Sequence, residues 1–123
     1  YNFARLYEGL QGLEDRLILP QATEDSAPSW FGFLMTCRKG IDRNKVVQRI
    51  EQQGVQTRML FAGNLTKHPC FDQMRSECKE YRVIGELVHT DRIMENSFWV
   101  GVYPGMTDKM IDYMISVITE AVS

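Results

Sequence analysis

Two segments of the chain carry most of the residues that could bind a small molecule or react with it. Residues 55–71 contain Arg58 and Asn64, and residues 89–105 contain Arg92. Each segment joins a short apolar strand to a polar loop that glycine or proline interrupts, and binding groups are concentrated on such loops. Guanidinium groups recognise phosphate, carboxylate and sugar oxygens by charge and by paired hydrogen bonds. The pattern therefore indicates a binding surface without the full set of groups that a catalytic centre needs.

Arg92 and Arg58 each allow two interpretations. Arg92 lies near a predicted helix start, where it either contacts an oxygen of a ligand or forms a surface ion pair with Asp91 or Glu95. Arg58 lies in a short strand, where its side chain either points into a cleft or extends along the sheet edge with its charge in water. By spacing alone the surface interpretations are the commoner ones.

Asn64 also has two interpretations. The preceding Gly63 makes this pair a strong turn signal by itself. The side chain of Asn64 therefore either forms the turn or offers its amide to a sugar or nucleotide. We favour the contact with a ligand, because a glycine at position 63 lets a ligand approach the backbone closely.

No catalytic or metal-binding set accompanies these residues. The only histidines are His68 and His89, and neither has a carboxylate or serine at a spacing that suggests a triad. The three cysteines, Cys37, Cys70 and Cys78, are odd in number and lack the Cys-x-x-Cys spacing of zinc and redox sites. We therefore predict reduced thiols, a cytoplasmic location and no metal site.

The composition is that of a single soluble domain. The chain has 123 residues, of which 44% are hydrophobic and 24% are charged, and its net charge is −2. One core suits this length, and the weak negative charge gives no reason to expect nucleic acid or an anionic membrane as a partner. No apolar run approaches the ~20 residues that span a bilayer. The chain opens at Tyr1 in what reads as the middle of a helix, so we expect a fragment of a longer protein.

The predicted elements alternate between helices and short strands. Apolar residues at helical spacing and clear caps predict the helices, and two-sided apolar runs predict the strands. Long helices are expected at 1–15, 42–54 and 107–122, strands at 30–37, 55–60 and 97–103, and short helices at 70–78 and 87–94. This order predicts an α+β fold: a two-layer sandwich of three short, mostly antiparallel strands with flanking helices.

The two-sided strands also predict what surrounds the sheet. The strand at 30–37 has Trp30 and Leu34 on one face and Phe31, Phe33 and Met35 on the other, which is the pattern of a central strand covered on both sides. In so small a chain, one of the two covers could come from another domain.

The first helix needs a partner as well. Gly9 and Gly12 each weaken it by ~1 kcal/mol relative to alanine. We therefore expect it to pack against another part of a longer protein.

Four stretches carry a family resemblance. They are Ser-Trp-Phe-Gly-Phe at 29–33, Thr-Arg-Met-Leu-Phe-Ala-Gly-Asn-Leu-Thr at 57–66, Thr-Asp-Arg-Ile-Met at 90–94, and the closing strand, turn and helix at 98–122. Together they resemble the C-terminal small domain of the DegT/DnrJ/EryC1-type sugar aminotransferases and dehydrases, which are pyridoxal phosphate enzymes of fold type I. The likeness covers nearly the whole chain. It is closest to the nucleotide-linked 4-keto-6-deoxyhexose 3-dehydrases, in particular the CDP-linked members of lipopolysaccharide O-antigen biosynthesis.

The resemblance implies a parent enzyme whose large pyridoxal phosphate domain lies elsewhere. That enzyme would use pyridoxamine phosphate to remove the C3 hydroxyl of a nucleotide-linked 4-keto-6-deoxyhexose, and it would act as a homodimer with an NADH-dependent reductase. This chain would form one wall of the cleft. Alone it would be inactive, carry no catalytic residue and bind no cofactor.

The resemblance also completes a set of expected substrate-binding residues: Phe31, Arg58, Asn64 and Arg92. Phe31 enters because aminotransferase relatives commonly have Trp-His where this chain has Trp30 and Phe31. Loss of a titratable group there would suit an enzyme that eliminates a hydroxyl group rather than one that delivers an amine.

Two other functions stay open at this point. One is the same domain of a nucleotide-sugar aminotransferase, against which Phe31 speaks. The other is a non-enzymatic α+β binding module, which predicts a polar outer face on the first helix. The apolar stripe of Phe3, Leu6 and Tyr7 counts against that module.

Overall fold

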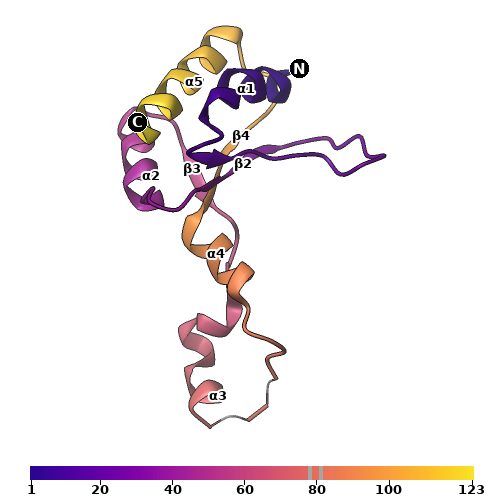
Figure 1. Ribbon diagram of the computed structural model, residues 1–123, viewed down its shortest axis with the longest axis vertical. Coiled ribbons are helices and arrows are strands. Elements are labelled where there is room, and N and C mark those ends of the chain that lie inside the picture. Colours follow the sequence, from indigo (N-terminus) through magenta and orange to yellow (C-terminus); the bar gives the residue numbers. More distant parts are fainter. Residues whose placement is uncertain (78, 81) are drawn as a thin grey trace.

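The computed structural model describes residues 1–77, 79–80 and 82–123, which form a body, an arm and a long loop (Figure 1). The body is a small sheet with three helices on one side. The arm, which we define as the described part of residues 61–96, extends away from the sheet. The loop at residues 19–31 projects sideways from the body.

The sheet contains four antiparallel strands in the spatial order β1-β2-β4-β3. Their bounds are β1 Leu17–Ile18, β2 Gly32–Cys37, β3 Thr57–Met59 and β4 Ser97–Gly101. The α+β class and the three predicted strands are confirmed, each strand being shorter than predicted. The prediction of only three strands was wrong, because β1 has two residues and is too short to show an alternating pattern.

Three helices cover one face of the sheet (Figure 1). They are α1 Asn2–Leu10, α2 Arg43–Gln52 and α5 Asp108–Val122. The predicted caps of two of them are confirmed: the Asp42 carboxylate and the Thr107 hydroxyl each accept hydrogen bonds from backbone N–H groups of the first turn. Large apolar side chains fill the space between helices and sheet; the fully buried ones include Leu6, Leu10, Phe33, Met35, Ile50, Phe98, Val100, Ile111 and Ile118.

The partner of the first helix is α5 of this same chain. Leu6 and Leu10 are fully buried, and a β-carbon on Gly9 would come within 2.3 Å of Cδ1 of Ile115. Gly9 therefore weakens α1 as an isolated helix and also permits its close contact with α5. A packing partner for α1 is thus found within this chain, and a contact with another part of a longer protein stays a prediction. α1 ends earlier than predicted, in a 3₁₀ turn, η1 (Gln11–Leu13).

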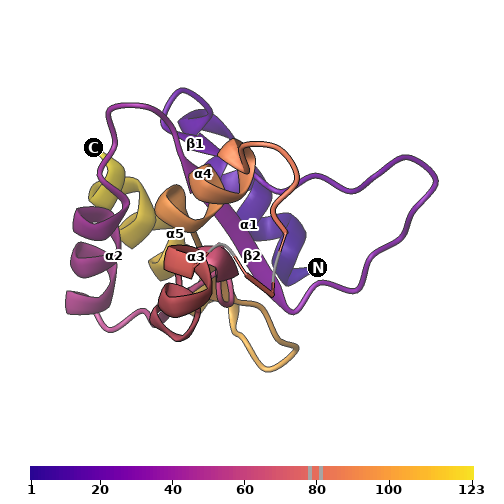
Figure 2. The ribbon, with the colours of Figure 1, turned by 90° about the horizontal axis from the view of Figure 1, so that it is seen from below.

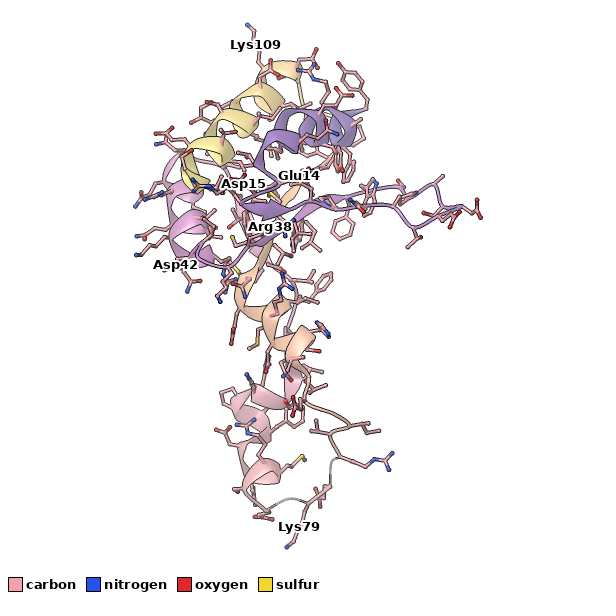
Figure 3. The ribbon with its side chains drawn as sticks, in the orientation of Figure 1. Glu14, Asp15, Arg38, Asp42, Lys79 and Lys109 are labelled. Atoms are coloured by element: carbon pink, nitrogen blue, oxygen red, sulfur yellow. The ribbon has the colours of Figure 1, made fainter. Side chains whose placement is uncertain are left out.

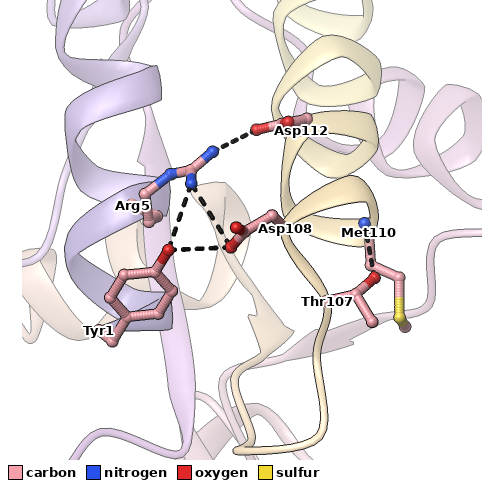
Figure 4. Close-up of polar contacts among 6 residues, drawn as sticks. All are labelled: Tyr1, Arg5, Thr107, Asp108, Met110 and Asp112. Atoms are coloured by element: carbon pink, nitrogen blue, oxygen red, sulfur yellow. Dashed lines mark hydrogen bonds and ion pairs between the residues drawn. The ribbon is translucent and has the colours of Figure 1, made fainter.

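Polar side chains join α1 and α5 along their exposed edge (Figure 4). Arg5 Nη2 lies 2.5 Å from Oδ1 of Asp112, and Nη1 lies 3.5 Å from Oδ1 of Asp108. The hydroxyl group of Tyr1 donates a 3.0 Å hydrogen bond to Asp108. Because exposed ion pairs contribute little free energy, these contacts mainly fix the relative orientation of two helices that apolar packing already holds together.

The second face of the sheet is only partly covered by the described residues. In β2, Phe33, Met35 and Cys37 are buried under the helices, whereas Leu34 and Thr36 are half-buried. α4 (Val88–Asn96) contacts β2 and β4 and leads directly into β4; Figure 2 shows it in front of the sheet in the view from below. The described residues thus cover one face fully and the other in part, and the cover expected from another domain stays a prediction.

The alternation predicted for residues 30–37 also fails at its beginning. The strand starts at Gly32, so the two preceding residues do not follow its alternation. The ring of Trp30 stacks on Phe3 of α1 at 4.7 Å, whereas the ring of Phe31 lies 5.3 Å from that of Trp99 and is 66% exposed. Placing Phe31 on the same face as Phe33 was wrong.

The arm is built from short helices. They are η2 Leu65–Lys67, η3 Pro69–Phe71, α3 Asp72–Glu77 and α4. The weak helix predicted at 70–78 corresponds to α3, while Cys78 lies outside the described residues. Lys79 at the tip of the arm and Lys109 in α5 mark opposite ends of the molecule (Figure 3). No helix in the described residues is long and apolar enough to cross a membrane.

Candidate functional site

The half-covered face of the sheet carries a row of side chains from three strands. The register pairs Leu34 of β2 with Trp99 of β4, and Trp99 with Arg58 of β3. Two residues further along the strands, on the same face, Gly32 pairs with Gly101. The indole of Trp99, at the centre of the row, therefore has the guanidinium of Arg58 on one side. Next to it along the strands lie two glycines, which have no side chains.

Three contacts hold Trp99 in one orientation. Its ring lies over Gly32, where a β-carbon would come within 2.6 Å of the ring carbon Cε3. Its Nε1–H donates a 3.2 Å hydrogen bond to the carbonyl oxygen of Met59. The ring of Phe31 meets it edge-on, at a centroid distance of 5.3 Å and an interplanar angle of 77°, which is a favoured geometry for aromatic pairs. We call Phe31, Arg58 and Trp99 the Trp99 face.

Two members of the Trp99 face are available to a ligand. Phe31 is 66% exposed, and in the described part of the chain no hydrogen bond or ion pair holds the guanidinium of Arg58. Arg58 and Trp99 also line a groove of about 450 Å³ together with Tyr103 and Tyr113. Aromatic rings and a guanidinium can receive sugar rings, planar rings and phosphate groups. The Trp99 face is thus suited to form one wall of a binding cleft.

Asn64 lies in a second cluster, on the arm. It is 3% exposed, and its Oδ1 caps η2 by accepting a 3.0 Å hydrogen bond from the backbone N–H of Thr66. Its Nδ2 donates a 2.7 Å hydrogen bond to Oδ1 of Asp91, whose Oδ2 lies 2.9 Å from Nζ of Lys67. Hydrogen bonds from Asn64 and Lys67 lower the pKa of Asp91. Asn64 therefore forms the turn, and its contact with a substrate stays a prediction.

Arg92 lies next to this cluster, in α4, with its side chain exposed. Asp91 pairs with Lys67, and the described residues contain no ion pair between Arg92 and Asp91 or Glu95. The four predicted substrate-binding residues thus form two groups. Phe31 and Arg58 flank Trp99, while Asn64 and Arg92 belong to the arm.

The histidines and cysteines add no reactive centre to either group. His68 Nε2 lies 2.5 Å from the carbonyl oxygen of Ala62, and His89 is exposed in the first turn of α4. Cys37 is buried in the core, and this burial raises its pKa to about 11, whereas Cys70 is exposed on the arm. Residues 1–77, 79–80 and 82–123 contain no group of three histidine, cysteine or acidic side chains that could hold a metal ion.

Trp99 is the member of this site that the sequence did not reveal. Its strand is apolar on both faces, so an ordinary core position was the natural interpretation. The available signal was Gly32, which interrupts a strand of large apolar residues; a glycine inside a strand often marks the close approach of another group.

A family assignment follows from the comparison with known sequences. The sequence profile of the DegT/DnrJ/EryC1/StrS aminotransferase family matches residues 1–119. The chain belongs to this family. The match confirms the resemblance found in the sequence motifs.

Two curated relatives match nearly the whole chain. Lipopolysaccharide biosynthesis protein RfbH of Salmonella typhimurium is 46% identical over 117 residues, which are 94% of this chain. The dTDP-4-dehydro-2,6-dideoxy-D-glucose 3-dehydratase of Saccharopolyspora spinosa is 47% identical over 124 residues, and the match covers 99% of this chain. Each match covers 26% of the relative, so this DegT-family chain spans about a quarter of the relatives' length.

Solved structures of the family share the fold. The E. coli GDP-4-keto-6-deoxy-D-mannose-3-dehydratase with bound hydrated PLP superposes with a TM-score of 0.77 at 22% identity, over 95% of this chain and 29% of that one. An aminotransferase from Psychrobacter cryohalolentis gives a TM-score of 0.78 at 18% identity, over 97% of this chain and 32% of that one. At identities this low, these superpositions establish a common fold and nothing further.

Proposed function

We propose that this chain is the C-terminal small domain of a nucleotide-sugar 3-dehydratase that uses pyridoxamine phosphate, and that it forms one wall of the active site. The observation that carries the proposal is the Trp99 face: Phe31 and Arg58 flank an immobilised indole on a sheet face that this chain covers only in part. Support also comes from the curated relative named as a 3-dehydratase, which is 47% identical.

The proposed substrate is a nucleotide-linked 4-keto-6-deoxyhexose that loses its C3 hydroxyl group. A sugar with a keto group at C4 occurs in the names of the Saccharopolyspora relative, where it is linked to dTDP, and of the E. coli structural neighbour, where it is linked to GDP. Arg58 would bind an anionic oxygen of such a substrate, because its guanidinium, which is paired with none of the described residues, is suited to phosphate. Phe31 and Trp99 would shield the sugar from water and orient it.

The described residues do not by themselves make a pyridoxal phosphate site. The Trp99 face offers rings and one cation, while the amine of Lys67 and the carboxylate of Asp91 are paired with each other. The groups that hold the cofactor would therefore belong to the rest of the enzyme. When bound there, the cofactor would supply the electron sink that lets the C3 hydroxyl group leave. Phe31 would contribute an apolar, non-titrating surface on the cofactor side of the cleft.

The enzyme around this domain is part of the same proposal. We place it in the cytoplasm as a homodimer, with an NADH-dependent reductase as the partner that supplies electrons. The alternative is a nucleotide-sugar aminotransferase, because the Psychrobacter aminotransferase shares the same fold. The two functions differ in product: a 3-deoxy sugar or an amino sugar.

The test uses the full-length enzyme that contains this chain, loaded with pyridoxamine phosphate. It is supplied in turn with CDP-, dTDP- and GDP-linked 4-keto-6-deoxyhexoses, with and without glutamate and with and without NADH and an NADH-dependent reductase, and the products are weighed by mass spectrometry. Loss of the C3 oxygen from one of these sugars is expected, and a product that only gains an amino group would contradict the proposal.

Variants test the assigned face. Arg58→Ala should raise KM for the sugar nucleotide by about tenfold, whereas Lys109→Ala, at an exposed position in the first turn of α5, should leave it unchanged. Phe31→His should slow dehydration. Unchanged dehydration in Phe31→His would remove the role proposed for Phe31.

A further inference from the structure

The side chain of Asn64 has almost no capacity left for a ligand. It is buried, and its Oδ1 accepts hydrogen bonds from both the backbone N–H and the hydroxyl group of Thr66, at 3.0 and 2.7 Å. Its Nδ2 donates to Oδ1 of Asp91 at 2.7 Å. An asparagine side chain has two acceptor sites and two N–H donors, so only one N–H group of Asn64 is not used in these contacts.

Asp91 is fixed from two sides. One carboxylate oxygen accepts the hydrogen bond from Asn64, and the other lies 2.9 Å from Nζ of Lys67. Asn64 and Lys67 both belong to the segment at 61–67, while Asp91 lies in the first turn of α4. Two charge-assisted contacts therefore connect that segment to α4, and such contacts are stronger and more directional than neutral ones.

The backbone of the same segment packs on α4 one turn further along. Gly63 adopts φ +62°, and a β-carbon there would come within 2.4 Å of Cγ of Met94. The sulfur of Met94 accepts a hydrogen bond from the backbone N–H of Asn64 at 3.3 Å. Asp91 and Met94 are three residues apart, so they lie on one face of the helix. The segment thus contacts α4 along that face.

The other end of α4 is fastened to the body. The guanidinium of Arg43, in the first turn of α2, lies 3.4 Å from the carbonyl oxygen of Met94 and 3.3 Å from that of Ser97. These carbonyls stand at the C-terminal end of α4, where a cation is favourable. α4 is therefore held at both ends, and Arg92, one residue beyond Asp91, is presented on a different side of the helix with its side chain exposed.

We propose that Asn64 is a positioning residue: with Asp91 and Lys67 it locks the segment at 61–67 to α4, and so determines where α4 presents Arg92. This inference rests on the proposed function for its catalytic readout, because that readout requires Arg92, one of the residues expected from the sequence to bind substrate, to contact the sugar nucleotide. It replaces a direct contact between Asn64 and the sugar by an indirect effect through the helix.

Reciprocal substitution in the full-length enzyme separates the two roles. Asn64→Asp brings two carboxylates together, so we expect the amides of residues 88–96 to exchange hydrogen for deuterium at least about tenfold faster. We also expect KM for the sugar nucleotide to rise about tenfold, with kcat changed less than about twofold. Asn44→Asp, the same change at an exposed position of α2, should alter neither measurement.

The double variant Asn64→Asp with Asp91→Asn decides the matter. It restores an amide donor opposite a carboxylate, so it should recover most of the exchange protection and most of the KM. If KM stays as high as in Asn64→Asp while protection recovers, Asn64 touches the substrate itself and the positioning role fails. The role also fails if Asn64→Asp leaves exchange in α4 unchanged. Hydrogen exchange is measured without substrate. It therefore tests whether Asn64 holds the segment at 61–67 against α4 even if the enzyme dehydrates none of the sugars and the proposed function fails.

Discussion

The indole ring of Trp99 occupies the space that a side chain at Gly32 would need. The two residues lie on neighbouring antiparallel strands, and a β-carbon on Gly32 would come within 2.6 Å of the ring. The opposite glycine, Gly101, has nothing within 4 Å of its own β-carbon position. The position of the indole thus requires a glycine at 32 but not at 101, although both glycines lie on the same face of the sheet.

Gly32→Ala should therefore displace the indole, whereas Gly101→Ala should not. We expect the first change to lower the free energy of unfolding by about 1–3 kcal/mol, the usual cost of overpacking, and to alter the fluorescence of Trp99 in a Trp30→Phe background. Gly101→Ala should change both by little. Equal effects of the two substitutions on stability and fluorescence would show that Gly32 does not seat the indole.

Gly9 and Gly12 allow the same comparison for the packing of α1 on α5. A β-carbon on Gly9 would collide with Ile115, while none of the surrounding atoms lies within 4 Å of one on Gly12. Alanine is favoured over glycine in a helix by up to ~1 kcal/mol, but overpacking at Gly9 should outweigh this gain. We expect Gly9→Ala to destabilise the chain and Gly12→Ala to be neutral or stabilising, as measured by urea unfolding. Stabilisation by Gly9→Ala would contradict the close packing of α1 on α5.

The cysteines should differ strongly in reactivity. Burial raises the pKa of Cys37 to about 11, so at pH 8 only about one in a thousand of its thiols is ionised, and the thiolate is the reactive form. Cys70 is exposed. We expect iodoacetamide to modify Cys70 at least about a hundredfold faster than Cys37, followed peptide by peptide with mass spectrometry, and urea to abolish the difference. Equal rates in the native state would mean that the core opens readily at β2.

Local signals in the sequence predicted the elements better than the contacts between them. Asp42 and Thr107 are followed by regular apolar spacing, and both cap helices as expected because a cap acts on its own first turn. The hydrogen bond from Asn64 to Asp91 joins residues 27 positions apart, and no periodic pattern encodes such a pairing. The sequence therefore suggested Asn64 as a residue of interest but not its partner.

The same limit explains the errors at the sheet. Trp30 and Phe31 were assigned faces by alternation, which holds only inside a strand, and β2 begins one residue later. The position of Trp99 depends on a glycine in another strand, so its strand alone resembled ordinary core. Family resemblance supplied Phe31, but only the structure brought Phe31, Trp99 and Arg58 together.

The cluster around Asp91 predicts a specific dependence of stability on pH. Hydrogen bonds from Asn64 and Lys67 lower the pKa of Asp91 in the folded chain below its ordinary value of about 3.9. A lowered pKa means that the folded state holds the carboxylate more favourably than the unfolded state does. The resulting stabilisation is complete above the ordinary pKa and is lost as the pH falls through the lowered one.

Asp91→Asn should therefore lower the urea midpoint at pH 7, and the difference from the unsubstituted chain should shrink as the pH falls from about 4 towards 2.5. Asp25→Asn, at an exposed position of the loop at 19–31, serves as the matched control and should shift the midpoint at neither pH. The measurement is a series of urea titrations from pH 7 to pH 2.5. A difference between Asp91→Asn and the unsubstituted chain that stays constant over this range would mean that shape, and not the charge of Asp91, fastens the segment at 61–67 to α4.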